Sequence, residues 1–437
     1  MKTNHRSAFS GTLLSAGFCK FIFFILLFLP CFVFAQDIKY ARHIVDTLAS
    51  PSFEGRGYNF NGDKKSAGFI RREFKSMGVK CFDTGYFQTV TFPVNSFSGV
   101  TNVRINHRKL KPGADFVVMP YSSAAHGKYK TIRLDSAVFY NKTALDNFKK
   151  TDFKKYFIVV DEKGITDKKD KEMFEAVRFN GLKAKGVITV TDSKPKFGIL
   201  KIKAEFPAVE IRRSLLPKKS FTIKTRIDNE FVELYSSQNV IGYIPGSAQP
   251  DSFIVITAHY DHLGRMGKVY FPGANDNASG VAMMMDFAKY YTQKENTPKY
   301  SIVFIAFTGE EIGLEGSKTF VAKPFFPLGK IKFLINLDLA GTGDDGVTIV
   351  NSIVSKNEFD RLTAINANKK YLPQVKARGK ASISDHHPFT EKNVPCFYIY
   401  TMGGISEYHN IYDKAETLPL TAYENYFRLL RDFIKTF

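Results

Sequence analysis

Two adjacent carboxylates, Glu310 and Glu311, lie in the stretch FTGEEIGL (residues 307–314), which follows directly on the apolar run SIVFIA (residues 301–306). A short apolar run of this kind predicts a buried strand, so the two carboxylates are expected at its end. Burying an unpaired carboxylate is costly, and two that lie side by side also repel each other. The sequence therefore indicates that groups from elsewhere in the chain compensate Glu310 and Glu311.

Other side chains able to bind a metal also stand at the ends of predicted strands or at the start of a predicted helix. They are His259, Asp261, His262, Asp276, Asp338 and His409. In open α/β sheets, ligands bind beyond the carboxyl ends of the strands, so we expect these residues on one rim. A single His or Asp at a strand end is usually a structural group. Several together are typical of a zinc site, and its cations would compensate the two glutamates.

The elements that position these residues follow from the hydrophobic pattern. Apolar runs predict strands over 252–258, 301–307, 332–337 and 395–400, with helices over 280–291 and at the C-terminus. Continuous apolar strands separated by helices are typical of a mostly parallel α/β sheet covered on both faces. From about residue 95 to 235, short β-rich runs alternate with lysine-rich turns and one helix-like stretch (171–183). This change predicts a separate α+β module.

The motifs, in their order, resemble the five metal-site motifs of the co-catalytic di-zinc aminopeptidase and glutamate carboxypeptidase superfamily. They are HYDH (259–262), PGANDNASG (272–280), EEIGLEGS (310–317), NLD (336–338) and YH (408–409). The stretches 48–57 and 384–389 extend the resemblance over nearly the whole chain after residue 35. It implies a mostly parallel mixed sheet flanked by helices, formed by residues 36–94 and 236–437, with a smaller α+β domain inserted at 95–235. That insert resembles the protease-associated domain, more weakly than the rest.

The resemblance also implies which residues hold two zinc ions. His259 and Asp338 would bind one ion, Glu311 and His409 the other, and Asp276 would bridge them. It further implies a cis peptide bond between Asp276 and Asn277.

Three further residues receive catalytic or supporting roles from the resemblance. Glu310 matches the general base, and Asp261 matches the carboxylate that orients the metal-bound histidine. Tyr408 is a candidate for stabilising the oxyanion, although an aromatic residue beside a ligand often only packs. The remaining histidines near the motifs are interpreted as polar loop or supporting residues: His262, His386 and His387.

The function that the resemblance implies is a zinc-dependent aminopeptidase acting on peptides, with a water bridged by two zinc ions and Glu310 as its base. A carboxypeptidase needs a cation for the terminal carboxylate, and the motif loops contain one arginine, Arg265. The same loops contain Asp261, Glu315 and Glu407, which would attract a free α-ammonium group. A carboxypeptidase, a glutaminyl cyclase or a non-catalytic peptide-binding ectodomain are the alternatives. The absence of Trp disfavours the cyclase, and the complete ligand set disfavours the ectodomain.

The N-terminus carries the pattern of an export signal. Lys2, Arg6 and Lys20 precede the apolar run 21–29, and the residues VFA (33–35) offer a cleavage site. The apolar run is short and is followed by Pro30, which disfavours a membrane anchor. We therefore expect cleavage after residue 35, a periplasmic or secreted protein, and no stable membrane insertion afterwards.

Two features of composition set limits on partners and covalent links. The formal net charge is +20, but the basic residues form scattered pairs and no nucleic-acid-binding motif, so a solvated basic surface is expected rather than nucleic-acid binding. After cleavage, only Cys81 and Cys396 remain. One bridge between them is conceivable, but a buried free thiol is favoured for Cys396 because it lies in the apolar run 394–400.

Overall fold

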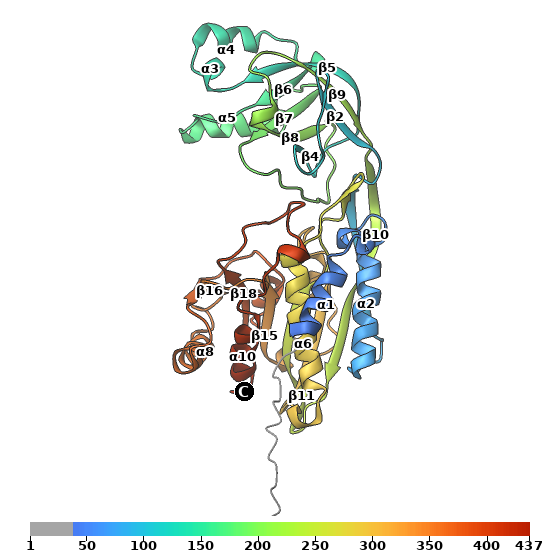
Figure 1. The fold of residues 1–437 in the computed structure, drawn as a ribbon, viewed down its shortest axis with the longest axis vertical. Helices are drawn as coiled ribbons and strands as arrows, with labels where there is room; N and C mark the ends of the chain where they lie inside the picture. The colour runs from blue at the N-terminus through green and yellow to red at the C-terminus, as the bar shows by residue number, and fades with distance from the viewer. Residues whose placement is uncertain (1–37) are drawn as a thin grey trace, which may run out of the picture. The chain divides into compact units, whose positions relative to one another are not determined.

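The computed structural model describes residues 38–437, which contain two eight-stranded sheets and their helices (Figure 1). The predicted export signal, residues 1–35, lies outside this part of the chain. Within residues 38–437, no helix is long and apolar enough to cross a membrane.

The first sheet is mixed and mostly parallel, as expected. Its strand order is β1 (Phe87–Ser96), β10 (Glu230–Ile244), β14 (Tyr300–Phe307), β11 (Gln249–His259), β15 (Ile331–Asp338), β18 (Cys396–Met402), β16 (Gly346–Val350) and β17 (Val375–Ala377). The four central strands, β14, β11, β15 and β18, are parallel to one another. Strands β10 and β16 run antiparallel to their neighbours in this central group. The carboxyl ends of the four central strands therefore meet at one edge.

Helices cover both faces of the first sheet, which explains why its central strands are apolar without alternation. Ile254 and Ile256 of β11 belong to the core on one face, and Val255 between them belongs to the core on the other. The first face is covered by α1 (Ile38–Leu48), α2 (Gly62–Met77), α6 (Gly280–Tyr291) and α10 (Tyr423–Ile434). The second face is covered by α7 (Glu315–Ala322) and α9 (His386–Thr390).

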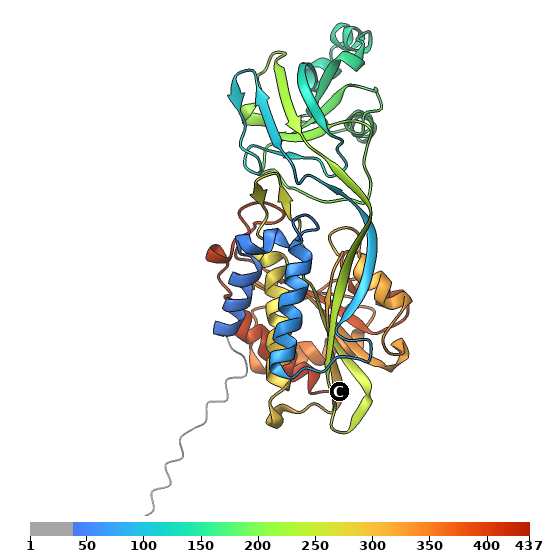
Figure 2. The same ribbon diagram turned by 90° about the vertical axis from the view of Figure 1, so that its right-hand side faces the viewer.

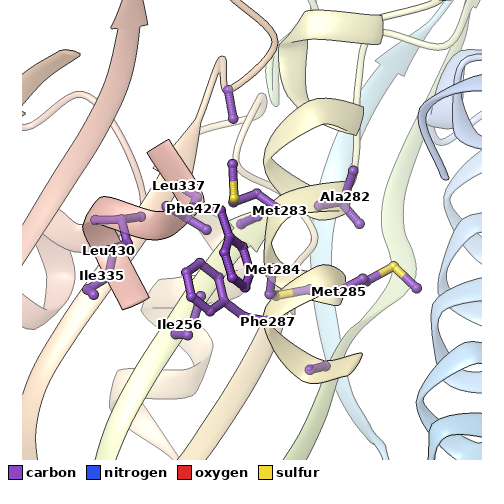
Figure 3. Close-up of a cluster of buried hydrophobic side chains, with 14 of the residues drawn as sticks. Ile256, Ala282, Met283, Met284, Met285, Phe287, Ile335, Leu337, Phe427 and Leu430 are labelled. Carbon is purple, nitrogen blue, oxygen red and sulfur yellow. The ribbon is translucent and has the colours of Figure 1, made fainter. Parts of the chain in front are cut away.

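Helix α6 is the most deeply buried of these helices. The sequence predicted one apolar stripe, but nearly every residue of α6 is buried because α1, α2 and α10 pack around it as well as the sheet. Phe287 stacks on Phe427 of α10 with ring centroids 4.2 Å apart, while Met285 extends from the opposite side of the helix (Figure 3). The loop that precedes α6 and carries Asp276 is thus attached to a firmly packed element.

The second sheet is the smaller α+β unit that the sequence predicted. Its order is β3 (Arg108–Lys109), β2 (Thr101–Ile105), β9 (Thr222–Ile227), β5 (Ala125–Leu134), β6 (Tyr156–Val160), β7 (Gly186–Thr191), β8 (Ala208–Arg212) and β4 (Phe116–Val118). Its helices are α3 (Ser136–Phe139), α4 (Lys142–Lys149) and α5 (Lys168–Arg178). Strands β1 and β10 pair with each other and lead from one sheet to the other (Figure 2). The domain boundaries predicted near residues 95 and 235 fall inside these two strands.

Both cysteines within residues 38–437 are free. Cys81 is exposed and Cys396 is buried, and neither forms a disulfide. Burial raises the pKa of the Cys396 thiol, which accepts a hydrogen bond from Asn351 Nδ2 at 3.4 Å. The prediction of a buried free thiol at Cys396 is confirmed.

Candidate metal centre

Each of the four central parallel strands of the first sheet leads into a candidate ligand. His259 ends β11 and Asp338 ends β15, Glu310 and Glu311 follow β14, and His409 lies in the loop after β18. Asp276 comes from the helical turn Ala274–Ser279 that opens α6. The carboxyl ends of parallel strands meet at one edge of a sheet, which is why residues so far apart in sequence converge there.

The first group of donors consists of His259, Asp276 and Asp338, and all three are buried. His259 Nε2 lies 3.4 Å from Asp276 Oδ1 and 3.5 Å from Asp338 Oδ1. Tyr398 donates a hydrogen bond to the other oxygen of Asp338 at 3.2 Å. This group presents one imidazole nitrogen and two carboxylate oxygens to a common point.

The second group of donors shares Asp276 with the first. His409 Nε2 lies 3.0 Å from Asp276 Oδ2 and 3.2 Å from Glu311 Oε2. His262 Nδ1 lies 2.6 Å from the other Glu311 oxygen and 3.9 Å from Asp276 Oδ2, so the structure brings His262 into this group although the sequence interpretation gave it only a supporting place. The two oxygens of Asp276 face different groups, as a bridging ligand requires.

The donor set fits two divalent cations. Within residues 38–437, Asp276 Oδ2, His262 Nε2 and His409 Nε2 are buried without a hydrogen-bond partner. In the same part of the chain, no lysine or arginine forms an ion pair with the carboxylates of Asp276, Glu311 or Asp338. Buried carboxylates and polar atoms of this kind need a partner, and imidazole nitrogens with carboxylate oxygens are zinc ligands.

The electrostatics favour ionisation of Asp276 and Glu311, whereas burial raises the pKa of Asp338. Burial opposes ionisation of Asp276, but His259 and His409 outweigh it and hold its pKa well below the usual range. Burial likewise opposes ionisation of Glu311, yet His409 and His262 lower its pKa to about 2. The same contacts overcome burial at His409 and raise its pKa to about 11. Asp276 and Glu311 are therefore ionised at neutral pH, as ligands of a cation need to be.

Glu310 has the opposite tendency. Burial raises its pKa well above the usual value, and Asp385, Glu311 and Asp338 add to the effect while His259 opposes it. A carboxyl group whose pKa is raised toward the working pH is suited to general acid–base work. Glu310 and Glu311 are the same residue type, but their surroundings shift their pKa values in opposite directions.

Asp261 acts on the glutamates more directly than on His259. Its carboxylate accepts hydrogen bonds from the backbone N–H groups of Glu310 and Glu311, both at 3.3 Å, and from the Tyr58 hydroxyl at 2.5 Å. The contact with His259 Nδ1 is made by the backbone carbonyl of Asp261 at 3.2 Å, while the carboxylate lies 3.7 Å away. Asp261 therefore connects two of the ligand loops.

Two supporting residues were not assigned a role from the sequence. Arg56 is fully buried, and its guanidinium donates to five backbone carbonyls, those of Leu48, Tyr260, Pro272, Gly273 and Asp276. Asp413 accepts hydrogen bonds from the backbone N–H groups of Asn275 and Asp276 at 2.8 and 3.0 Å. Arg56 thus binds backbone carbonyls of the loop that carries Asp276, and Asp413 binds its backbone N–H groups, so both kinds of backbone polar group are held in place. The peptide bond between Asp276 and Asn277 is cis, as the resemblance implied.

The acidic residues expected to attract a substrate α-ammonium group already have partners. Glu315 forms an ion pair with Lys201 at 2.6 Å, and Glu407 forms one with Lys194. Asp261 is buried and engaged as described above. All three acids are therefore engaged within the protein, and their attraction for a substrate α-ammonium group stays a prediction. Their partners Lys194 and Lys201 come from the inserted region, which the local sequence around each acid does not reveal.

The remaining aromatic and histidine candidates lie around the two donor groups. The Tyr408 ring stacks on the His409 ring with centroids 3.8 Å apart and is 40% exposed. His386 stacks on Tyr398, whose hydroxyl donates to Asp338, and His387 lies near Glu391. Neither His386 nor His387 belongs to the two donor groups found within residues 38–437.

Comparison with known proteins places this site in a family. Residues 239–434 match peptidase family M28. Aminopeptidase YwaD of Bacillus subtilis (strain 168) is 29% identical over 202 residues, which cover 44% of this chain and 42% of the relative. A probable zinc metalloprotease of Pyricularia oryzae is 37% identical over 114 residues, or 25% of this chain and 22% of the relative. The matched segments thus span less than half the length of these curated relatives.

Solved structures share the fold over both sheets. The peptidase M28 precursor from Shewanella amazonensis SB2B has a TM-score of 0.69 at 20% identity, covering 92% of this chain and 93% of that chain. BSAP, a zinc aminopeptidase from Bacillus subtilis, has a TM-score of 0.67 at 20% identity, covering 92% and 95%. The order of the motifs and the donor geometry at the strand ends agree with the family match, which spans residues 239–434 and so includes every candidate ligand.

Proposed function

We propose that the protein is an exported zinc-dependent aminopeptidase that removes N-terminal residues from peptides. The position of Asp276 carries this proposal, because its two oxygens face two separate groups of zinc-type donors. One carboxylate shared in this way is what a pair of neighbouring ions requires. The similarity to proteins named aminopeptidases supports the reaction class.

The residues of the chain divide the work of peptide hydrolysis. When bound, two zinc ions supply Lewis acidity that polarises a carbonyl and lowers the pKa of water. His259, Asp338, Glu311 and His409 would hold them, and Asp276 would contribute one oxygen to each donor group. Glu310 accepts a proton from the water that attacks the peptide carbonyl and returns it to the amine that leaves as the C–N bond breaks. Asp261 keeps Glu310 in place through its backbone N–H.

The state of Arg265 favours cleavage at the N-terminal end of a peptide. A carboxypeptidase binds the terminal carboxylate, typically with a free arginine. Arg265, the one arginine of the motif loops, is bound to Glu54 at 2.5 Å and lies over the Phe60 ring. It is therefore engaged within the protein and not available to a substrate carboxylate.

Zinc analysis combined with a panel of blocked peptides tests this function. Purified protein is expected to hold two equivalents of zinc and to cleave peptides with a free N-terminus. N-acetylation should abolish cleavage, whereas C-terminal amidation of a longer peptide should leave it nearly unchanged. The reverse pattern would show a carboxypeptidase. N-terminal sequencing of the mature protein tests export, with Gln36 expected as the first residue.

The variant Asp276→Ala tests whether Asp276 is shared by two metal ions. The substitution removes the carboxylate shared by both donor groups, so both equivalents of zinc and all activity should be lost together. Retention of two equivalents after dialysis would contradict the bridging role of Asp276.

A further inference from the structure

We infer that the inserted region completes the metal centre: residues 194–197 act as positioning residues for His409. This inference rests on the proposed zinc-binding role of His409 and assigns the insert a part in the reaction. None of these residues touches the substrate in this scheme. They act through the loop that carries the ligand.

The segment belongs to an unusually long connection. Strand β7 ends at Thr191 and β8 begins at Ala208, and residues 192–207 between them form no helix or strand. Connections longer than about 12–15 residues without secondary structure are uncommon in compact domains and are usually functional. This connection leaves the second sheet to contact the loop after β18 and then returns.

Phe197 contacts both ligand loops. Its backbone N–H donates to the carbonyl of His409 at 2.9 Å. Its buried ring stacks on Phe271 with centroids 4.7 Å apart and an angle of 17° between the planes. Phe271 directly precedes the PGANDN loop that carries Asp276. One residue of the insert is thus in contact with the loops of two ligands in the second donor group.

Two lysines contact the two residues that precede His409. Lys194 forms an ion pair with Glu407, which also accepts a hydrogen bond from Asn410 Nδ2 at 2.9 Å. The ammonium of Lys196 lies 5.3 Å from the centroid of the Tyr408 ring. That ring stacks in turn on His409, so Lys196, Tyr408 and His409 form a layered arrangement.

The backbone of His409 explains why such contacts are needed. Its φ is +55°, in the left-handed region that residues with a side chain rarely occupy. Such a conformation persists only where the surroundings over-determine it. The hydrogen bond to the His409 carbonyl and the contacts of its neighbours Glu407, Tyr408 and Asn410 provide that constraint. The insert therefore holds the ligand in its binding conformation before metal arrives.

Zinc affinity measured by competition with a chelator tests the inference. The double variant Lys194→Met/Lys196→Met removes both cations but keeps two side chains of similar length. Lys203→Met is the matched control, because Lys203 lies in the same connection but over Phe231, away from the His409 loop. Contacts that orient metal ligands typically affect affinity by about 10–100-fold. We expect one of two equivalents to bind about tenfold more weakly in the double variant, with the other unchanged.

The conservative pair Lys194→Arg/Lys196→Arg should restore the weaker equivalent, because arginine keeps the ion pair and the contact with the ring. The inference is overturned if the double variant binds both equivalents as tightly as the control. It is also overturned if both weaken equally and the zinc-free protein melts at a lower temperature, since that pattern reports general destabilisation. Wild-type protein that binds fewer than two equivalents would contradict the proposed function itself, before any variant is compared.

Discussion

At the scale of single residues, Glu310 and Glu311 show how neighbouring carboxyls acquire different chemistry. Burial raises the pKa of Glu310, and nearby carboxylates add to that effect. Glu311 is also buried, but His409 and His262 lower its pKa to about 2. Carboxyl groups whose pKa values are pushed apart by their surroundings are typical of acid–base and ligand pairs. The different surroundings of the two buried carboxyls suit them to the proposed roles of base for Glu310 and ligand for Glu311.

Glu310→Gln should separate these two roles. The amide keeps the size of the side chain but cannot accept the proton, so kcat is expected to fall by about 10²–10⁴-fold. Zinc content should stay at the wild-type level, because Glu310 belongs to neither donor group. Steady-state kinetics and zinc analysis on the same preparation measure both quantities. Loss of one zinc equivalent would instead identify Glu310 as a ligand.

At the scale of elements, Asp63 connects the first turn of α2 to β10, the strand next to the edge strand β1. Its two oxygens accept hydrogen bonds from Tyr235 and Ser237, each at 2.7 Å. The Ser237 hydroxyl also lies 2.7 Å from that of Thr308, which follows β14 two residues before Glu310. Burial outweighs the two hydrogen bonds and raises the pKa of Asp63 from 3.8 to about 6. The contact is therefore sensitive to pH.

Asp63→Asn is expected to change how stability depends on pH. Between pH 4 and 6 the folded protein holds a proton on Asp63 that the unfolded chain has released. The contribution of Asp63 is therefore full below pH 4 and is lost as pH rises through 6. The loss amounts to about 3 kcal/mol, from a shift of roughly two pKa units. Urea unfolding at pH 4 and 7 should show wild type losing that much relative to the variant. Parallel profiles would refute this.

The sequence predicted the elements that carry the site better than the elements around it. The four central strands could be predicted from uninterrupted apolar runs, because side chains on both faces of these strands are buried. Helix α8 (Lys356–Lys369) was not predicted, since Leu362 is its only buried residue and it has no apolar stripe. The candidate ligands could be predicted because strand ends converge by topology. The contacts of Arg56, Asp413 and Lys194 could not, because they depend on how distant loops meet.

At the scale of the whole molecule, positive charge is concentrated in the insert. Residues 95–235 contain 29 Lys and Arg against 16 Asp and Glu. The basic residues looked scattered along the sequence, but strand pairing aligns four of them. Arg104 pairs with Lys109 and with Lys224, and Lys224 pairs with Lys128. All four are exposed, and within residues 38–437 none forms an ion pair with an acid. Like charges directly opposite each other destabilise a sheet.

Lys224→Glu should therefore stabilise the protein. The substitution replaces two repulsive cross-strand pairs, with Arg104 and Lys128, by two attractive ones. Each favourable pair contributes roughly 0.2–1 kcal/mol, so a gain of about 1 kcal/mol in the free energy of unfolding is expected at low salt. Lys224→Gln, which only removes repulsion, should give about half of it. A gain that persists unchanged in 1 M NaCl, where such charges are screened, would rule out the electrostatic cause.

The placement of ligands at four neighbouring strand ends also determines when the protein acquires its metal. His259 and His409 are separated by most of the second half of the sequence, and Asp276, Glu311 and Asp338 lie between them. The first donor group needs β11 and β15 to have paired, and the second also needs β14 and the loop after β18, so metal uptake follows folding and then stabilises the folded state by mass action. A chain exported unfolded carries no zinc with it. If the chain is exported as proposed, its activity depends on the zinc supply of the compartment in which it folds, and not on that of the cytoplasm.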